Sequence, residues 1–223
     1  MNSNLNFSKI SAVACFIACI GDFLLTIILG YFYPGYNHLK LVMSELGTAK
    51  SPVAVWISTW WIIYGLLIII FGIGLGKALN FKNTLSKLSA FLIILFGIGA
   101  GIGAGIFPYN SSIKEVVILD TLHDIFAGTG YIAILFLPII LIKLFLRVKL
   151  KGMVILSTIT QIMGLIFFII FITSENSIYK NNILAYSGLW QRLFLLNYYV
   201  YFLILSSKIN RPVTTSEVVT GLF

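Results

Sequence analysis

The residues able to do chemistry gather in a few polar stretches of an otherwise apolar chain. The stretch ILDTLHDIFAGTG, residues 118–130, holds Asp120, His123 and Asp124. In a helix that starts there, these three side chains share one face, because residues three and four apart are neighbours on a helix. An imidazole between carboxylates suits a general base or a metal ligand. A solvated turn with Asp120 as the helix N-cap explains the same residues, and both interpretations stay open.

A second polar group lies in YPGYNHLKLVMSELGTAKSP, residues 33–52, which holds His38, Ser44 and Glu45. With His123 and Asp124, these are the candidate catalytic residues. The alternative is structural: Ser44 caps a short helix and Glu45 is solvated. The segment also carries five large apolar residues between positions 38 and 46, so we expect it to lie along a membrane surface or to fold back over helices.

Two charges, Asp22 and Arg192, stand inside long apolar runs. A charge at the centre of a bilayer costs about 2.5–3.5 kcal/mol and normally faces a partner. Their depths, roughly 16 Å and roughly 12 Å at the rise of a helix, differ by less than one turn. We therefore predict that they pair, directly or through Gln191 or water. The pair is either purely structural, or Asp22 positions Arg192 to bind the phosphate or carboxylate of a ligand, with Trp190 beside it.

The composition places the chain among integral membrane proteins. Of its 223 residues, 59% are hydrophobic and 10% are charged, and the mean hydropathy is +1.02. Soluble domains carry about 25% charged residues, so this chain has too few to face water on all sides. The formal charge of +8 does not indicate a nucleic-acid partner, because the basic residues lie at the ends of apolar runs, where they act as topology signals.

The apolar runs predict an all-α, polytopic membrane protein. A bilayer core about 30 Å thick needs about 20 apolar residues in a helix. Six runs satisfy this length and leave no soluble domain, so residues 1–223 are expected to form a single six-transmembrane-helix bundle. The predicted spans are roughly 10–33, 53–76, 88–107, 122–143, 152–173 and 184–206.

The basic residues predict the orientation. Ten lie at one set of helix ends and four in the opposite loops, which puts the N- and C-termini in the cytoplasm by the positive-inside rule. The ten are Lys9, Lys77, Lys82, Lys87, Lys143, Arg147, Lys149, Lys151, Lys208 and Arg211. Both histidines and most carboxylates then fall on the outer side. We expect a multi-pass protein of the cell membrane (plasma membrane).

The third run, LFGIGAGIGAGIFP, predicts close helix packing. Gly97, Gly101 and Gly105 recur every four residues, and Gly99 and Gly103 form a second stripe. Such stripes of small residues let helix backbones approach closely inside a membrane. A nucleotide-binding loop is not expected, since the flanking strand and lysine are missing.

Four of these pieces together resemble a known family. They are HLKLVMSELGTAKSP in the first outer loop, GIFPYN after the glycine run, LHDIFAG at the fourth run and GLWQRL in the sixth. In this order the chain resembles the six-helix membrane proteins of domain-of-unknown-function family 998. The resemblance implies a six-span fold and directs attention to His38, Ser44, Glu45, Pro108, His123 and Arg192. It implies no activity.

Three functions fit these observations. The first is binding or transport of a small amphiphile or lipid head group in a pocket open to the outer face, which requires no cofactor. The second is a hydrolase of outer-leaflet lipids, in which zinc is held by His38, Asp120, His123 and Asp124. The third is a non-catalytic membrane partner, in which the glycine stripes make the contacts. The expected partners are membrane lipid and a small amphiphilic ligand.

Overall fold

The computed structural model describes residues 2–79, 83–109, 117–174 and 182–209. Every regular element in these ranges is a helix. The elements are α1 (Asn2–Tyr31), η1 (Met43–Gly47), α2 (Ala54–Ala78), α3 (Thr84–Phe96), η2 (Gly97–Gly103), α4 (Ala104–Ile106), α5 (Val117–Arg147), α6 (Lys151–Thr173), η5 (Ile183–Ala185) and α7 (Ser187–Ile209).

Five helices of the described chain are long and apolar enough to cross a membrane. They are Phe7–Tyr31, Ala54–Ala78, Thr84–Ile106, Ile118–Arg147 and Lys151–Thr173. They match the first five predicted spans. The sixth predicted span corresponds to α7, which has 23 residues but a more polar composition, because it carries Gln191, Arg192 and Asn197.

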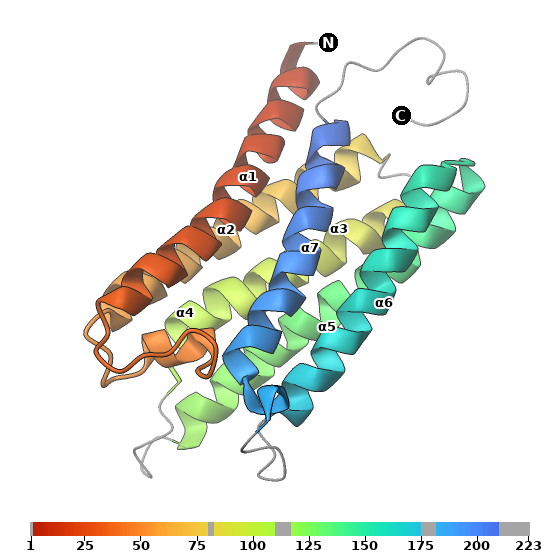
Figure 1. Ribbon diagram of the computed structural model, residues 1–223. Coiled ribbons are helices and arrows are strands. Elements are labelled where there is room, and N and C mark those ends of the chain that lie inside the picture. Colours follow the sequence, from red (N-terminus) through yellow and green to blue (C-terminus); the bar gives the residue numbers. More distant parts are fainter. Residues whose placement is uncertain (1, 80–82, 110–116, 175–181, 210–223) are drawn as a thin grey trace.

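The two ends of the helix bundle differ in charge. In Figure 1 the start of α1 and the end of α7 lie at one end, together with the connections α2–α3 and α5–α6. We call this the basic end, because its described basic residues are Lys9, Lys77, Lys87, Lys143, Arg147, Lys149, Lys151 and Lys208. Lys82 and Arg211, also counted in the prediction, lie outside the described residues. The opposite end, with η1, α4 and η5, is here called the site end.

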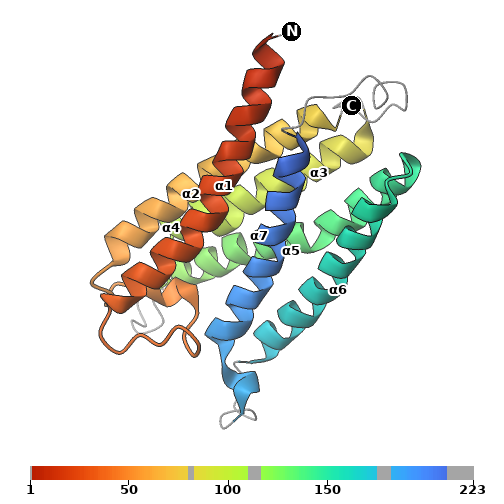
Figure 2. The same cartoon turned by 45° about the horizontal axis from the view of Figure 1, so that its top comes forward.

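α7 lies between α1 and α6 in both views (Figures 1 and 2) and packs against both and against α2. Large aromatic side chains fill these contacts: Phe194, Tyr198, Tyr201 and Phe202 are fully buried. A helix surrounded in this way does not need an apolar outer face. This explains why α7 is the least apolar of the long helices.

The glycine run packs as predicted, with one difference. Residues Gly97–Gly103 form a π-helical segment rather than a continuous α-helix. A Cβ on Gly101 would lie 2.5 Å from the Cα of Gly65 in α2, and a Cβ on Gly130 of α5 would lie 2.6 Å from the backbone nitrogen of Ala100. The two glycine stripes therefore seat η2 directly against the backbones of α2 and α5.

The loop between α1 and α2, here called the first loop, lies at the site end and folds back over the helices, as expected. Met43, Leu46 and Gly47 in η1 are buried. Ser44 is not a cap, since η1 begins at Met43. Asp120 is likewise not the N-cap of α5, which begins at Val117 and places Asp120 in its first turn.

Candidate functional site

A cavity of about 290 Å³ lies among the helices at the site end. It is lined by residues of α1, α2, α3, the η2 and α4 segment, α5, α6, α7 and η1. The lining residues are Asp22, Val42, Met43, Ser44, Trp61, Tyr64, Phe96, Ala100, Ala104, Tyr109, His123, Asp124, Ala127, Gly128, Tyr131, Phe168, Phe171, Ile172, Gln191, Leu195 and Tyr199. The volume is near the lower limit for a small-molecule site.

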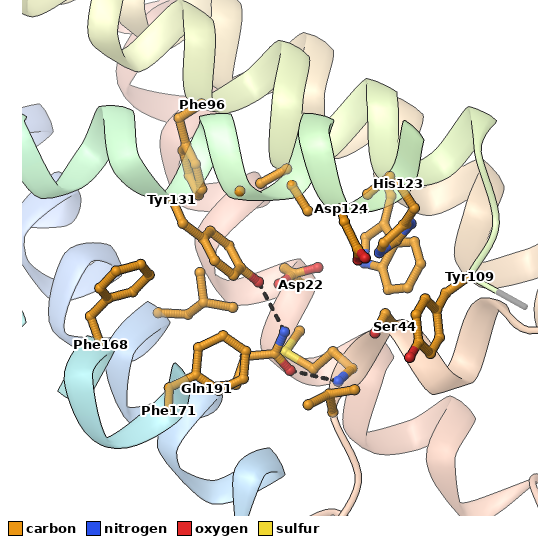
Figure 3. Close-up of a pocket in the computed structure, with 18 of the residues that line it drawn as sticks. Asp22, Ser44, Phe96, Tyr109, His123, Asp124, Tyr131, Phe168, Phe171 and Gln191 are labelled. Carbon is orange, nitrogen blue, oxygen red and sulfur yellow. Dashed lines mark hydrogen bonds between the residues drawn. The ribbon is translucent and has the colours of Figure 1, made fainter. Parts of the chain in front are cut away.

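The cavity has a polar end and an apolar end. Figure 3 shows Ser44, Tyr109, His123 and Asp124 on one side and Phe96, Phe168 and Phe171 on the other, with Asp22 between them. The apolar end lies against α6. Only 17% of the most apolar 18-residue stretch of this helix is buried inside the protein. Ile172 lines this end and is 57% exposed. The cavity therefore reaches a helix whose surface is largely open to the membrane.

Asp22 is buried at the middle of the cavity and is 2% exposed. Its Oδ1 accepts a hydrogen bond from Trp60 Nε1 at 3.1 Å, and its Oδ2 accepts one from the Tyr199 hydroxyl at 2.8 Å. The Tyr199 hydroxyl also lies 2.9 Å from that of Tyr64. α2 and α7 thus hold the carboxylate of α1 through neutral donors.

The predicted direct contact between Asp22 and Arg192 is wrong, because the guanidinium binds the first loop instead. Its NH1 donates to the carbonyl oxygens of Gly188 at 2.9 Å, Leu41 at 3.1 Å and His38, and its NH2 donates to the Tyr36 hydroxyl at 2.7 Å. Arg192 does not line the cavity. The charge of Arg192 acts on Asp22 only at longer range.

The start of α7 holds the first loop by several further bonds. The backbone N–H of Leu189 donates to the carbonyl of Leu39 at 2.8 Å, and the Ser187 hydroxyl donates to that of Lys40 at 2.9 Å. The side chain of Gln191 accepts from Met43 N at 2.6 Å and donates to the Tyr131 hydroxyl at 3.0 Å (Figure 3). Gln191 therefore joins the loop to α5 and does not connect Asp22 with Arg192.

His38 and Tyr36 lie within this loop, outside the cavity. The His38 imidazole packs against Gly30 and beside the rings of Tyr31 and Tyr36, and both its nitrogens are buried without a hydrogen-bond partner among the described residues. Burial, followed by the nearby charge of Arg192, lowers the pKa of His38. Burial raises the pKa of Tyr36, so its phenol stays protonated and can donate to the carbonyl of Val42.

His123 is the histidine of the cavity, and it is 5% exposed. Its Nδ1 lies 2.7 Å from the carbonyl oxygen of Phe107, which can only accept. Nδ1 must therefore carry the proton, and in the neutral imidazole Nε2 is left as an acceptor. Among the described residues Nε2 has no hydrogen-bond partner. This tautomer suits an acceptor or a general base in the cavity.

The structure brings together only part of the predicted site. Asp22, Ser44, His123, Asp124 and Gln191 line the cavity. His38, Glu45, Asp120, Trp190 and Arg192 do not. The four residues predicted to hold zinc are not assembled: no three His, Cys, Asp or Glu side chains of the described chain are grouped to hold a metal ion.

The aromatic residues of the site were not predicted from the sequence. Tyr64, Tyr131 and Tyr199 line the cavity from three helices, and Trp61 lines it from the start of α2. Trp61 is 6% exposed, whereas Trp56, also near the start of α2, is 72% exposed. Tyrosines deep in apolar runs were a usable signal, because a phenol buried in a membrane needs a polar partner.

The family model described as "Protein of unknown function (DUF998)" matches residues 16–208. The chain belongs to the DUF998 family. Comparisons with curated proteins and with solved structures give no match.

The four DUF998-like pieces of the sequence all contribute to the cavity. The first loop supplies Ser44, and GIFPYN supplies Tyr109. LHDIFAG supplies His123 and Asp124, and GLWQRL supplies Gln191. Segments far apart in this DUF998 chain thus meet at one place, the site end of the bundle.

Proposed function

We propose that this DUF998 protein binds a small amphiphile, as a carrier or receptor, in the cavity at the site end. The observation that carries the proposal is the division of the cavity into a polar end at His123 and Asp124 and an apolar end against α6, with Asp22 between them. An amphiphile would place its head group at the polar end and its tail toward α6 and the lipid. Ligand pockets commonly combine an apolar lining with a few convergent polar groups in this way.

The proposal includes the membrane arrangement. α7 crosses the membrane as the sixth span, because it is as long as α6 and its polar side chains are turned toward neighbouring helices and the first loop. The basic end faces the cytoplasm, as the positive-inside rule requires. The cavity then opens on the outer side of the cell membrane, where a lipid or another amphiphile of the outer leaflet can enter.

A blocked cavity tests the proposal. Ala127 lines the cavity from α5, whereas Ile132 lies on the same helix and is 49% exposed. The protein and the variants Ala127→Trp and Ile132→Trp are purified in lipid nanodiscs, and their bound molecules are identified by mass spectrometry. We expect an amphiphile that is present in the parent and in Ile132→Trp but is lost from Ala127→Trp. The same bound molecules in all three would contradict the proposal.

A lipid hydrolase is the second candidate, favoured by Ser44 and His123 lining the same cavity. The free Nε2 of His123 could act as a general base. Release of fatty acid from outer-leaflet lipids by the reconstituted protein, lost in both Ser44→Ala and His123→Gln, would favour the hydrolase over a binding protein. Binding of these lipids without release of fatty acid would exclude the hydrolase.

A further inference from the structure

We infer that the head group which this cavity accepts is a protonated amine. The inference rests on the proposed function and specifies its ligand class. It replaces the phosphate or carboxylate expected from the sequence, because that expectation depended on an arginine in the site. Arg192 is instead bonded to the first loop.

The first support is that Asp22 has no cationic side chain beside it in the lining of the cavity. The carboxylate is almost completely buried. Its donors Trp60, Tyr199 and Trp61 are neutral, and the charge of Arg192 acts on it only from outside the lining. No lysine or arginine is among the described residues that line the cavity. A buried carboxylate is normally paired with a cation. An ammonium group in the cavity would supply that cation.

The second support is independent of the carboxylates. His123 is nine-tenths buried or more, and its Nδ1–H is used by the Phe107 carbonyl. In the neutral imidazole Nε2 offers a lone pair, so a ligand atom hydrogen-bonded to it there is a donor. The amide of Gln191, by contrast, accepts from Met43 N with its oxygen and donates one of its two N–H groups to the Tyr131 hydroxyl, so only one N–H group of this amide remains for a ligand.

The aromatic lining agrees with a cation. Trp61, Tyr64, Tyr109 and Tyr131 are among the residues that line the cavity, and the faces of such rings attract ammonium groups. Asp124 adds a second carboxylate at the polar end (Figure 3). A phosphate or a carboxylate in the same place would meet two carboxylates and no cationic side chain of the described lining.

Three probes with the same tail test the inference. Decylamine, decanol and decyl phosphate differ only in the head group, and decylamine is protonated at pH 7.4. Their equilibrium binding is measured with radiolabelled probe on the protein in phosphatidylcholine nanodiscs, after subtraction of empty nanodiscs. We expect decylamine to bind at least tenfold more tightly than decanol, and decyl phosphate to show no saturable binding. Equal binding of all three, or tightest binding of the phosphate, overturns the inference but leaves amphiphile binding intact.

Variants locate the charge recognition. Asp22→Asn keeps the size of the side chain and should weaken decylamine binding at least tenfold while leaving decanol binding unchanged. Asp120→Asn is the matched control, since Asp120 does not line the cavity, and it should bind decylamine as the parent does. If Asp22→Asn does not fold, Asp124→Asn at the exposed rim takes its place. Unchanged decylamine binding in these variants would overturn the inference, and absence of saturable binding of every probe would overturn the proposed function itself.

Discussion

Arg192 holds the first loop onto α7 and does not line the cavity. Its donors reach three carbonyl oxygens and one phenol. Hydrogen bonds to a charged group are worth about 1.5–3 kcal/mol each, and removal of one partner leaves the others buried. We expect Arg192→Ala to lower the free energy of unfolding by about 3 kcal/mol, measured by denaturation of the protein in detergent micelles.

A matched pair of variants checks this role. Arg192→Lys keeps the charge, but one ammonium cannot reach all four acceptors, so we expect only partial recovery. Arg147→Ala removes an exposed arginine at the basic end and should change stability little. A stable Arg192→Ala protein with a protease-resistant first loop would contradict the assignment.

His38 makes the docking of the same loop sensitive to pH. Its pKa is lowered in the folded protein by burial and by Arg192, so below about pH 6.5, the ordinary value, the unfolded chain binds more protons than the folded one. The contribution of His38 to the free energy of unfolding is therefore fully present above pH 6.5. It is lost as the pH falls toward the lowered pKa of His38 in the folded protein.

The variant His38→Phe isolates this effect, because it keeps a ring against Gly30 but removes the titration. We expect the melting temperature of the parent to fall more between pH 7.5 and pH 5.0 than that of His38→Phe. Parallel pH profiles for the two proteins would show that the imidazole is not responsible.

At the scale of elements, the π-helical glycine segment sets how closely α2 and α5 approach. A Cβ on Gly101 would meet the Cα and N of Gly65 at 2.5 and 2.9 Å, and backbone atoms cannot move aside as a flexible side chain can. We expect Gly101→Ala to destabilise the protein by about 1–3 kcal/mol, the usual cost of overpacking.

Gly152 in the first turn of α6 is the control for this prediction, since a Cβ there meets nothing within 4 Å. Gly152→Ala should be neutral or stabilising by up to about 1 kcal/mol, because alanine favours the helix. Thermal unfolding of both variants in the same detergent provides the comparison. Equal behaviour of the two would mean that the glycine contact does not control helix packing.

At the scale of the whole molecule, the proposed arrangement requires that α7 crosses the membrane and that the site end faces outward. Single cysteines are placed at Lys50 and Asn182 of the site end and at Lys149 and Lys208 of the basic end, all exposed, after replacement of Cys15 and Cys19. A membrane-impermeant maleimide should label the first two in intact cells and the other two only after permeabilisation. Labelling of Asn182 and Lys208 from the same side would exclude a sixth span.

The sequence by itself determined the membrane class, the five apolar helices, the packing role of the glycine stripes and three residues of the polar end of the cavity, Ser44, His123 and Asp124. Each of these follows from a local pattern in the sequence: the length of an apolar run, a four-residue repeat, or polar residues at the ends of apolar runs. His123 and Asp124 were predictable because α5 alone puts them near its start.

The partners of the two buried charges depended on the tertiary structure. Asp22 and Arg192 have similar depths, but depth does not specify the direction in which a side chain points around its helix. Asp22 faces Trp60 and Tyr199, whereas Arg192 faces a folded-back loop. Every residue carries a carbonyl, so no sequence pattern marks the ones that a fold will bring to an arginine. The guanidinium of Arg192 binds the first loop. Asp22 remains in the cavity, and no lysine or arginine of the described residues lines that cavity.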